Sequence, residues 1–124
     1  DYFDVISGKD KDWVVIGDVS GHGILSGLIM MMVQTSIRLL ISKGEDITPA
    51  RVLKDVIYGI DENIRKISRF QFKYMTITVL CFDRAGNFTF AGQHQDLIIY
   101  RHKENEIEKL TTEGIWIGMA DLLK

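Results

Sequence analysis

Two aspartates, Asp1 and Asp18, are the residues of this sequence best suited to carry chemistry. Short apolar runs, residues 2–6 and 13–17, flank a polar, glycine-containing stretch between them, which predicts a β-hairpin. Symmetry about positions 9 and 10 would set the two aspartates opposite each other. Opposed carboxylates with Cβ atoms about 4.5–5.5 Å apart destabilise a sheet unless something positive lies between them. A divalent cation is one natural solution, and two solvated strand ends are the alternative.

The segment Gly17–Gly23, read as Gly-Asp-Val-Ser-Gly-His-Gly, supports the metal interpretation. Oxygen-only ligation suits Mg²⁺ or Mn²⁺, and no cluster of Cys and His in the sequence competes for zinc. Gly21 and Gly23 permit backbone conformations closed to other residues, so the backbone carbonyl of Val19 could also face an ion. The start of the following helix favours an anion such as phosphate. His22 is expected to serve the backbone geometry of this turn rather than to act as a base.

Two nucleotide-binding motifs are excluded at this position. A dinucleotide loop needs a small residue three positions after Gly23, which Ser26 only approximates, and a parallel strand as its next element. The phosphate loop of nucleotide hydrolases needs Gly-Lys-Ser/Thr, which this sequence lacks.

Two long helices follow the glycine-rich segment. Residues 24–43 are dense in apolar side chains and predict a mostly buried helix that Gly44 caps. This stretch is nearly long enough to span a bilayer, but interspersed polar residues favour a buried helix of a soluble protein. Thr48 and Pro49 begin a second helix that should end near Arg69. Its predicted core face consists of Leu53, Val56, Ile57, Ile60, Ile64 and Ile67.

The remainder of the chain is typical of β-structure. From Tyr74 onward the apolar period changes to two, with Met75, Ile77, Val79 and Cys81 expected on one face. Further strands are predicted at residues 88–91, 97–101 and 107–110, which together would form an antiparallel meander. A hairpin, two helices and a run of strands do not alternate as βαβ units, so the predicted class is α+β.

Composition narrows the function classes. The chain has 124 residues, of which 46% are hydrophobic and 26% charged, as expected of one ordinary soluble domain. A net charge of -2 with scattered basic residues argues against nucleic acid as a partner. The single cysteine, Cys81, cannot form an internal disulfide and is expected to be an inert core thiol. With no visible secretory signal, we expect a cytoplasmic protein, or the cytoplasmic part of a membrane-attached sensor.

Several motifs in order resemble those of a known family. They are Asp1–Asp4, Gly17–Gly23, Met75-Thr76, Ala91–Gln95 and Gly114–Gly118. Together they resemble the stage II sporulation protein E-like branch of the metal-dependent (PPM, or protein phosphatase 2C-like) serine/threonine phosphatases. The resemblance spans nearly the whole chain, and Gly17–Gly23 is its most specific part.

The resemblance implies an α-β-β-α sandwich with a two-metal centre between its sheets. It implies that Asp1, Asp18 and the Val19 carbonyl bind Mn²⁺ or Mg²⁺, with both aspartates essential to catalysis. Two such ions activate a bridging water for in-line attack on a phosphoryl group. The implied substrate is phosphoserine or phosphothreonine on a regulatory protein, as in bacterial anti-sigma factor antagonist signalling. Attached sensor or regulatory domains and a dimer are further implied partners.

Departures from the family pattern limit what these residues should do alone. The family's glycines before Asp1, its downstream Asp-Gly and its C-terminal Asp-Asp segments are missing, and the surroundings of Asp121 do not match. Residues 1–124 are therefore expected to be a partial domain with weak metal binding and little turnover. The alternative is a non-catalytic module that binds phosphoproteins.

Two further residues of these motifs are given lesser roles. Asp4 lies on the opposite strand face from Asp1, so solvent exposure or a local hydrogen bond is expected rather than metal ligation. For His94, between Gln93 and Gln95 where the family more usually has Gly-His-Pro, a loop role is expected rather than catalysis.

Overall fold

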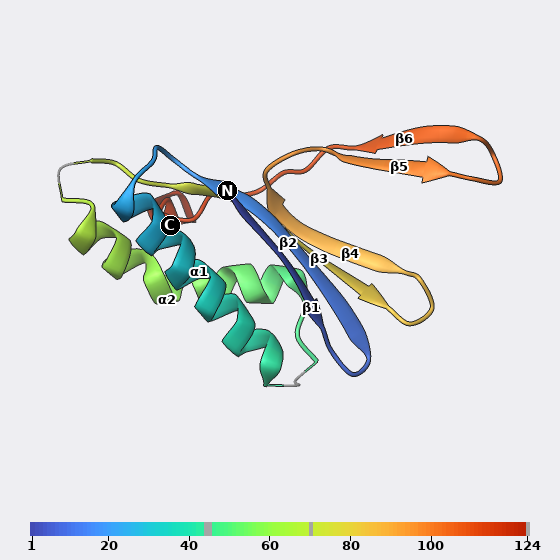
Figure 1. Cartoon of the computed structure of the whole chain (residues 1–124), viewed down its shortest axis with the longest axis horizontal. Coiled ribbons are helices and arrows are strands. Elements are labelled where there is room, and N and C mark those ends of the chain that lie inside the picture. Colours follow the sequence, from blue (N-terminus) through green and yellow to red (C-terminus); the bar gives the residue numbers. More distant parts are fainter. Residues whose placement is uncertain (44–45, 70, 124) are drawn as a thin grey trace.

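The computed structural model describes residues 1–43, 46–69 and 71–123. In chain order the elements are β1 (Tyr2–Ser7), β2 (Lys11–Val19), α1 (Ile24–Ser42), α2 (Pro49–Ile67), β3 (Met75–Asp83), β4 (Phe88–Gln93), β5 (Leu97–Arg101), β6 (Glu106–Leu110) and the short 3₁₀ helix η1 (Ala120–Leu123). The first four strands form one antiparallel sheet in the order β1-β2-β3-β4, and β5-β6 is a separate pair. The two helices cover one face of the larger sheet, and β5-β6 projects away from them (Figure 1). The predicted α+β class is confirmed.

The β1-β2 hairpin has the predicted register. Tyr2 pairs with Gly17 and Ser7 with Asp12, so the numbers of paired residues sum to nineteen, as symmetry about positions 9 and 10 requires. The strand β2 extends beyond the predicted run 13–17 at both ends, because its whole length also pairs with β3. The hairpin therefore becomes two adjacent strands of the larger sheet.

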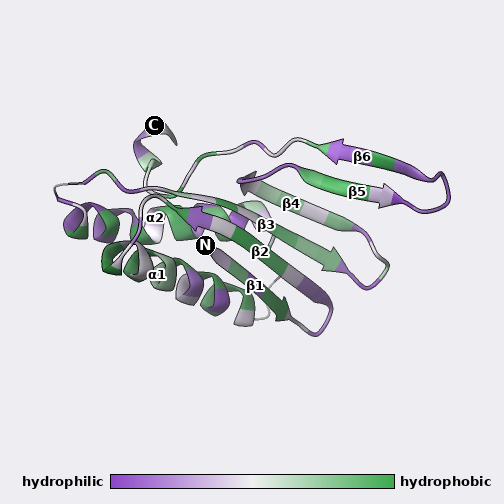
Figure 2. Cartoon of the chain, turned by 45° about the horizontal axis from the view of Figure 1, so that its top comes forward, coloured by the Kyte–Doolittle hydropathy of each residue, from purple (hydrophilic) through white to green (hydrophobic). Residues whose placement is uncertain are grey.

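The hydrophobic core lies between the helices and the inner face of this sheet. Its fully buried members come mainly from β2, β3, α1 and α2, and include Val15, Ile77, Val79, Ile29, Val33, Ile37, Val52 and Val56, with Ile117 added from the segment that follows β6. Figure 2 shows hydrophobic residues along the strands and hydrophilic residues in the turns that join them. The predicted inner face of β3 is confirmed, since Met75, Ile77, Val79 and Cys81 are all buried. Thr78 and Leu80 on its other face are buried as well, so burial does not alternate along this strand.

The prediction that the first helix is mostly buried is wrong. Only one stripe of α1 is buried, at Ser26, Ile29, Val33, Ile37 and Ile41. Large apolar side chains on its other side, Ile24, Leu28, Met31 and Leu39, are exposed. Among the described residues α1 packs against one sheet face and one neighbouring helix, and such a contact covers only a stripe.

By length and composition alone, α1 is apolar enough to cross a membrane. The expected cap at Gly44 lies outside the described residues, and the helix has Lys43 at its C-cap position.

The second helix follows its predicted pattern closely. The Thr48 hydroxyl accepts a hydrogen bond from the backbone N–H of Arg51 at 3.3 Å, as expected of an N-cap. The predicted core residues are buried except Ile67, which is 41% exposed. Ile67 is the last residue of α2, and the helix ends there, two residues before Arg69, so its side chain falls beyond the stripe that the sheet covers.

The predicted continuous meander is wrong after β4. The pair β5-β6 makes no ladder with β4 in the described part of the chain. Gly92, near the end of β4, has a φ of 94°, which departs from extended geometry. Beyond it, Ile117 pairs with Met75 and takes the place beside β3 that a longer β4 would fill. The chain must therefore leave the sheet before β5 begins.

Candidate metal centre

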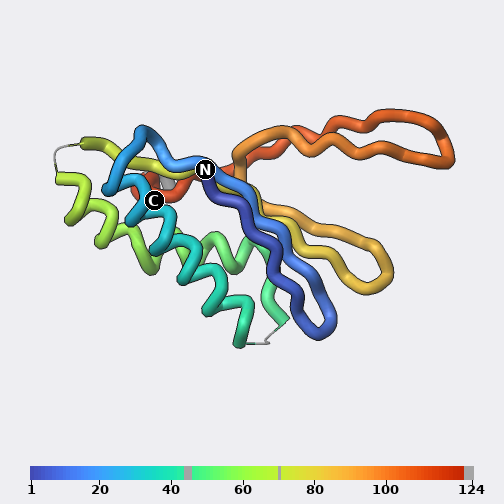
Figure 3. Tube along the Cα trace, in the orientation of Figure 1, coloured from blue at the N-terminus to red at the C-terminus, as the bar shows by residue number. Residues whose placement is uncertain are grey.

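Asp1 and Asp18 lie opposite each other where the β1-β2 hairpin ends. Tyr2 pairs with Gly17, and the next step of that register sets Asp1 opposite Asp18. The amino nitrogen of Asp1 lies 3.2 Å from Oδ1 of Asp18, and the two side chains are 99% and 52% exposed. The N-terminus lies at the end of the sheet where β2 leads towards α1 (Figure 3). The structure therefore brings the two aspartates together at an open edge.

Two more polar residues continue this line across the sheet. Asp18 pairs with Thr76 in β3, and the β3-β4 register, continued by one residue, sets His94 opposite Thr76. Directly opposed residues of neighbouring strands point to the same face of a sheet. We call Asp1, Asp18, Thr76 and His94 the polar row.

Hydrogen bonds connect three members of the polar row. The Thr76 hydroxyl donates to the backbone carbonyl of Asp18 at 3.3 Å and lies 2.8 Å from Nδ1 of His94. His94 lies in the bend that follows β4 and is half-buried. Sequence reasoning did not connect Thr76 or His94 with Asp18. The signal that could have done so is the register of three consecutive strand pairs.

The carbonyl of Val19 points to the same edge of β2 as Asp1. Backbone groups of successive residues in a strand point alternately to its two neighbours. The N–H of Ser20 donates to the carbonyl of Tyr74 at 2.9 Å, on the β3 side. The backbone groups of Val19 consequently face the β1 side, where Asp1 lies. This carbonyl supplies a third oxygen at the corner of the two aspartates.

The turn that follows β2 depends on its glycines. Gly21 and Gly23 have φ angles of 77° and 85°, a region that residues with a Cβ rarely adopt. His22 between them is exposed, and its carbonyl accepts a hydrogen bond from the Ser26 hydroxyl at 3.4 Å. The turn thus reverses the chain within four residues and brings the start of α1 next to Asp18.

Lys73 supports this turn from the interior. It is only 8% exposed, and its Nζ donates to the Ser20 carbonyl at 3.1 Å and to the Ser26 hydroxyl at 3.4 Å. A Cβ at Gly21 would lie 2.6 Å from this ammonium, so a larger residue there would displace the lysine head group as well as strain the positive-φ backbone. Lys73 could not be predicted from the sequence, because no pattern separates a buried lysine before a strand from a surface lysine.

Of the two outcomes expected for Asp4, solvent exposure or a local hydrogen bond, the structure has the hydrogen bond. Asp4 is 7% exposed and faces α1, on the opposite strand face from Asp1. Tyr2 donates its hydroxyl to Asp4 Oδ2 at 3.1 Å, and Arg38 of α1 donates Nε at 2.8 Å and Nη2 at 2.5 Å. Burial, the Asp4 charge and this hydrogen bond raise the pKa of the Tyr2 hydroxyl far above its ordinary value. The first strand is therefore anchored to α1 by a buried carboxylate.

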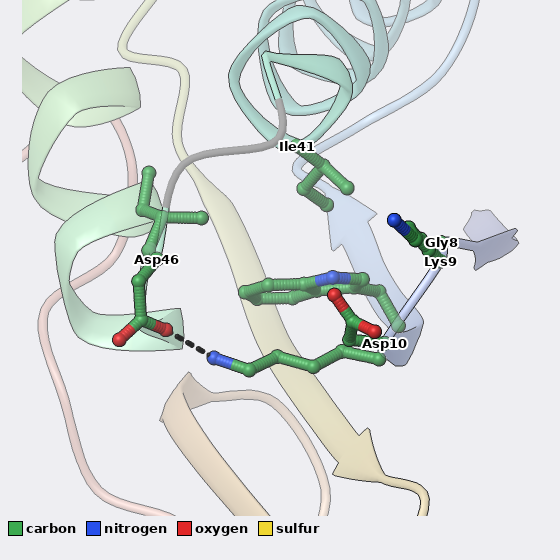
Figure 4. Close-up of a pocket in the computed structure, with 8 residues that line it drawn as sticks. Gly8, Lys9, Asp10, Ile41 and Asp46 are labelled. Atoms are coloured by element: carbon green, nitrogen blue, oxygen red, sulfur yellow. Dashed lines mark hydrogen bonds and ion pairs between the residues drawn. The ribbon is translucent and has the colours of Figure 1, made fainter.

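A separate hollow lies at the other end of the hairpin. It has a volume of about 360 Å³, and Gly8, Lys9, Asp10, Ile41 and Asp46 are among the residues that line it (Figure 4). An ion pair of 2.5 Å joins Lys11 Nζ to Asp46 at this place. At about 3.3 Å per residue along β2, the hollow lies roughly 20 Å or more from the polar row. It takes no part in the candidate centre.

Comparison with known proteins identifies the family. The sequence profile described as stage II sporulation protein E (SpoIIE) matches residues 8–124. The chain belongs to the SpoIIE family. This membership agrees with the motifs at Gly17–Gly23 and at Ala91–Gln95.

Solved structures of related domains share the fold of this SpoIIE domain. The SiaA-PP2C domain of Pseudomonas aeruginosa is 21% identical with a TM-score of 0.71, over 94% of this chain and 46% of that one. The RsbU and RsbW domains of Rv1364c from Mycobacterium tuberculosis are 22% identical with a TM-score of 0.68, and the match covers 90% of this chain and 30% of that one. A stage II sporulation E family protein from Thermanaerovibrio acidaminovorans is 14% identical with a TM-score of 0.70, and the match covers 98% of this chain and 58% of that one. This chain therefore spans between 30% and 58% of the structures it resembles.

The oxygen atoms of the corner fit a hydrated Mg²⁺ or Mn²⁺ ion. Within residues 1–43, 46–69 and 71–123, no three His, Cys, Asp or Glu side chains lie close enough together to hold a metal by themselves. Mg²⁺ keeps several waters and is commonly bound through only one or two carboxylates, and oxygen ligands also suit Mn²⁺. A hollow of about 250 Å³ beside Asp1 and Val19 leaves room for such waters. Asp1, Asp18 and the Val19 carbonyl therefore offer a set of oxygen donors that suits either ion.

Proposed function

We propose that this SpoIIE domain is a metal-dependent serine/threonine protein phosphatase that holds Mn²⁺ or Mg²⁺ at the corner of Asp1 and Asp18. The observation that carries the proposal is the position of these carboxylates, opposite each other across a hairpin and beside the turn into α1. Their mutual repulsion favours a cation between them. Membership in the SpoIIE family supports phosphatase chemistry at this corner.

Each residue of the corner has a defined part in this proposal. Asp1 and Asp18 hold the cations through their carboxylates, and Val19 contributes its backbone carbonyl. When bound, two divalent cations would supply a nucleophilic water and neutralise charge on the phosphoryl group. Thr76 donates to the carbonyl of Asp18 and so restrains the backbone beside the metal ligands.

The start of α1 would orient the phosphoryl group. Gly23 is the N-cap residue and has no side chain to cap the first N–H groups of the helix. Such groups, together with the helix dipole, stabilise an anion placed beside them. The buried ammonium of Lys73 adds positive charge to the same turn. The N–H groups would hold the phosphate oxygens while the aspartate corner prepares the attacking water.

The substrate and setting follow from the family. We propose phosphoserine or phosphothreonine on a regulatory protein, in bacterial signalling of the anti-sigma factor antagonist type, as the target. The similar structure from Rv1364c contains both an RsbU and an RsbW domain, which supports the idea that such domains work with attached partners. The buried, unpaired thiol of Cys81 supports a reducing, cytoplasmic setting.

The decisive experiment compares Asp18→Asn with the unmodified full-length protein in Mn²⁺-dependent hydrolysis of a phosphoserine protein. Loss of a ligand carboxylate should lower turnover by more than about 100-fold and weaken Mn²⁺ binding in calorimetry. Asp10→Asn, in the turn at the far end of the same hairpin, is the matched control and should keep full activity. Equal rates for Asp18→Asn and the unmodified protein would refute the mechanism. Phosphoprotein binding without turnover would favour the non-catalytic module.

A further inference from the structure

We propose that His94 is a further catalytic residue of this site and donates the proton that the departing serine or threonine oxygen requires. This assignment rests on the phosphatase function proposed above. His94 is the member of the polar row farthest from Asp1, and it comes from the β4 side of the sheet. It is held by Thr76, which also contacts the backbone of Asp18.

The hydrogen bonds around Thr76 orient the ring of His94. A threonine hydroxyl carries one hydrogen. When Thr76 donates that hydrogen to the Asp18 carbonyl, the 2.8 Å contact with His94 requires a hydrogen on Nδ1. Within the described part of the chain, this contact is the only hydrogen bond of the imidazole ring. Nε2 is therefore the nitrogen left to meet a substrate.

The place of His94 in the polar row suits the leaving-group side of the reaction. Neighbouring strands lie about 4.8 Å apart, so the backbone of His94 is about 10 Å from that of Asp18 and about 14 Å from that of Asp1. Thr76 stands between them in the polar row and has a short side chain. In-line phosphoryl transfer needs the attacking and leaving oxygens on opposite sides of phosphorus. The aspartate corner and His94 lie on opposite sides of Thr76 along the row.

Hydrolysis and the transfer of one proton from His94 are coupled in this step. Water adds to phosphorus while the bond between phosphorus and the serine oxygen breaks, and the Nε2 proton of the doubly protonated ring moves to that oxygen. The products are a neutral hydroxyl group and inorganic phosphate, and the proton released by the water restores His94. Histidine is the side chain that most often serves as a general acid or base in enzymes.

The test compares two leaving groups in the full-length protein with Mn²⁺. A serine alkoxide needs a proton to leave, whereas 4-nitrophenolate leaves readily without one. Loss of a general acid typically costs 10²–10⁴-fold in rate. His94→Gln should therefore lower kcat about 100-fold on a phosphoserine peptide. On 4-nitrophenyl phosphate the same variant should lower kcat by less than about 10-fold. Thr76→Val should also lower kcat more on the phosphoserine peptide than on 4-nitrophenyl phosphate, but by a smaller factor than His94→Gln.

The controls separate this assignment from a structural role and from the phosphatase proposal. His102→Gln changes an exposed histidine in the β5-β6 turn and should leave both reactions unchanged. Equal losses of His94→Gln on both substrates, at an unchanged melting temperature, would overturn the role of His94 and leave the phosphatase proposal intact. Absence of turnover by the unmodified protein on either substrate would overturn both.

Discussion

Replacing Arg38 with methionine should destabilise the protein by about 2–3 kcal/mol, because the Asp4 carboxylate then stays buried without its cation. Arg38 makes two charged hydrogen bonds to Asp4, and only the Tyr2 hydroxyl would remain as a side-chain donor. Methionine keeps most of the aliphatic length of arginine, so the change removes charge and hydrogen bonds more than packing.

The magnitude follows from the burial of the two partners. Breaking a buried ion pair costs about 3–5 kcal/mol when one charge is left uncompensated. The Asp4 side chain is 8% exposed, but that of Arg38 is 52% exposed, so water already screens part of the interaction. This screening lowers the expected cost to about 2–3 kcal/mol. For a chain of this size, each kcal/mol shifts the melting temperature by about 4 °C, which predicts a fall of about 8–12 °C.

The assay is a double-mutant cycle in urea with Arg38→Met, Asp4→Asn and the double variant. The double variant should lose about 2 kcal/mol less than the sum of the single variants. Arg101→Met is a matched control, since Arg101 is 50% exposed and its partner Glu108 is 43% exposed. That exposed pair should contribute less than about 1 kcal/mol. Equal losses for Arg38→Met and Arg101→Met would refute the argument from carboxylate burial.

Gly92→Ala should destabilise the protein by at least about 2 kcal/mol, since a Cβ there would lie 2.2 Å from the Ile77 carbonyl in a positive-φ conformation. Gly59→Ala, exposed in α2 with open space around the new methyl group, should instead stabilise it by about 0.5–1 kcal/mol in urea. Burial and Asp4 raise the pKa of Tyr2, so its contribution to stability is complete below about pH 10 and is lost as pH rises further. Tyr2→Phe should therefore flatten the alkaline fall in unfolding free energy, and a slope as steep as that of the exposed control Tyr58→Phe would contradict this.

Structural features that depend on residues close together in the chain could be predicted from the sequence. The register that sets Asp1 opposite Asp18 depends on a short turn and on two runs of alternating apolar residues. The core stripe of α2 depends on the helical period, and its start depends on Thr48 next to Pro49. Each of these features is decided by residues close together in the chain, so composition and spacing are enough to predict them.

The partners of the candidate site were decided only by the tertiary structure. Arg38 reaches Asp4 across 34 positions, and Lys73 reaches the Ser20 carbonyl across 53. Both contacts depend on where α1 packs and on which strands are neighbours. The partial exposure of α1 and the separation of β5-β6 from β4 have the same origin, since each depends on what else lies beside the element. The sequence by itself determined the carboxylate pair and its glycine turn, whereas strand order and helix placement decided which side chains surround them.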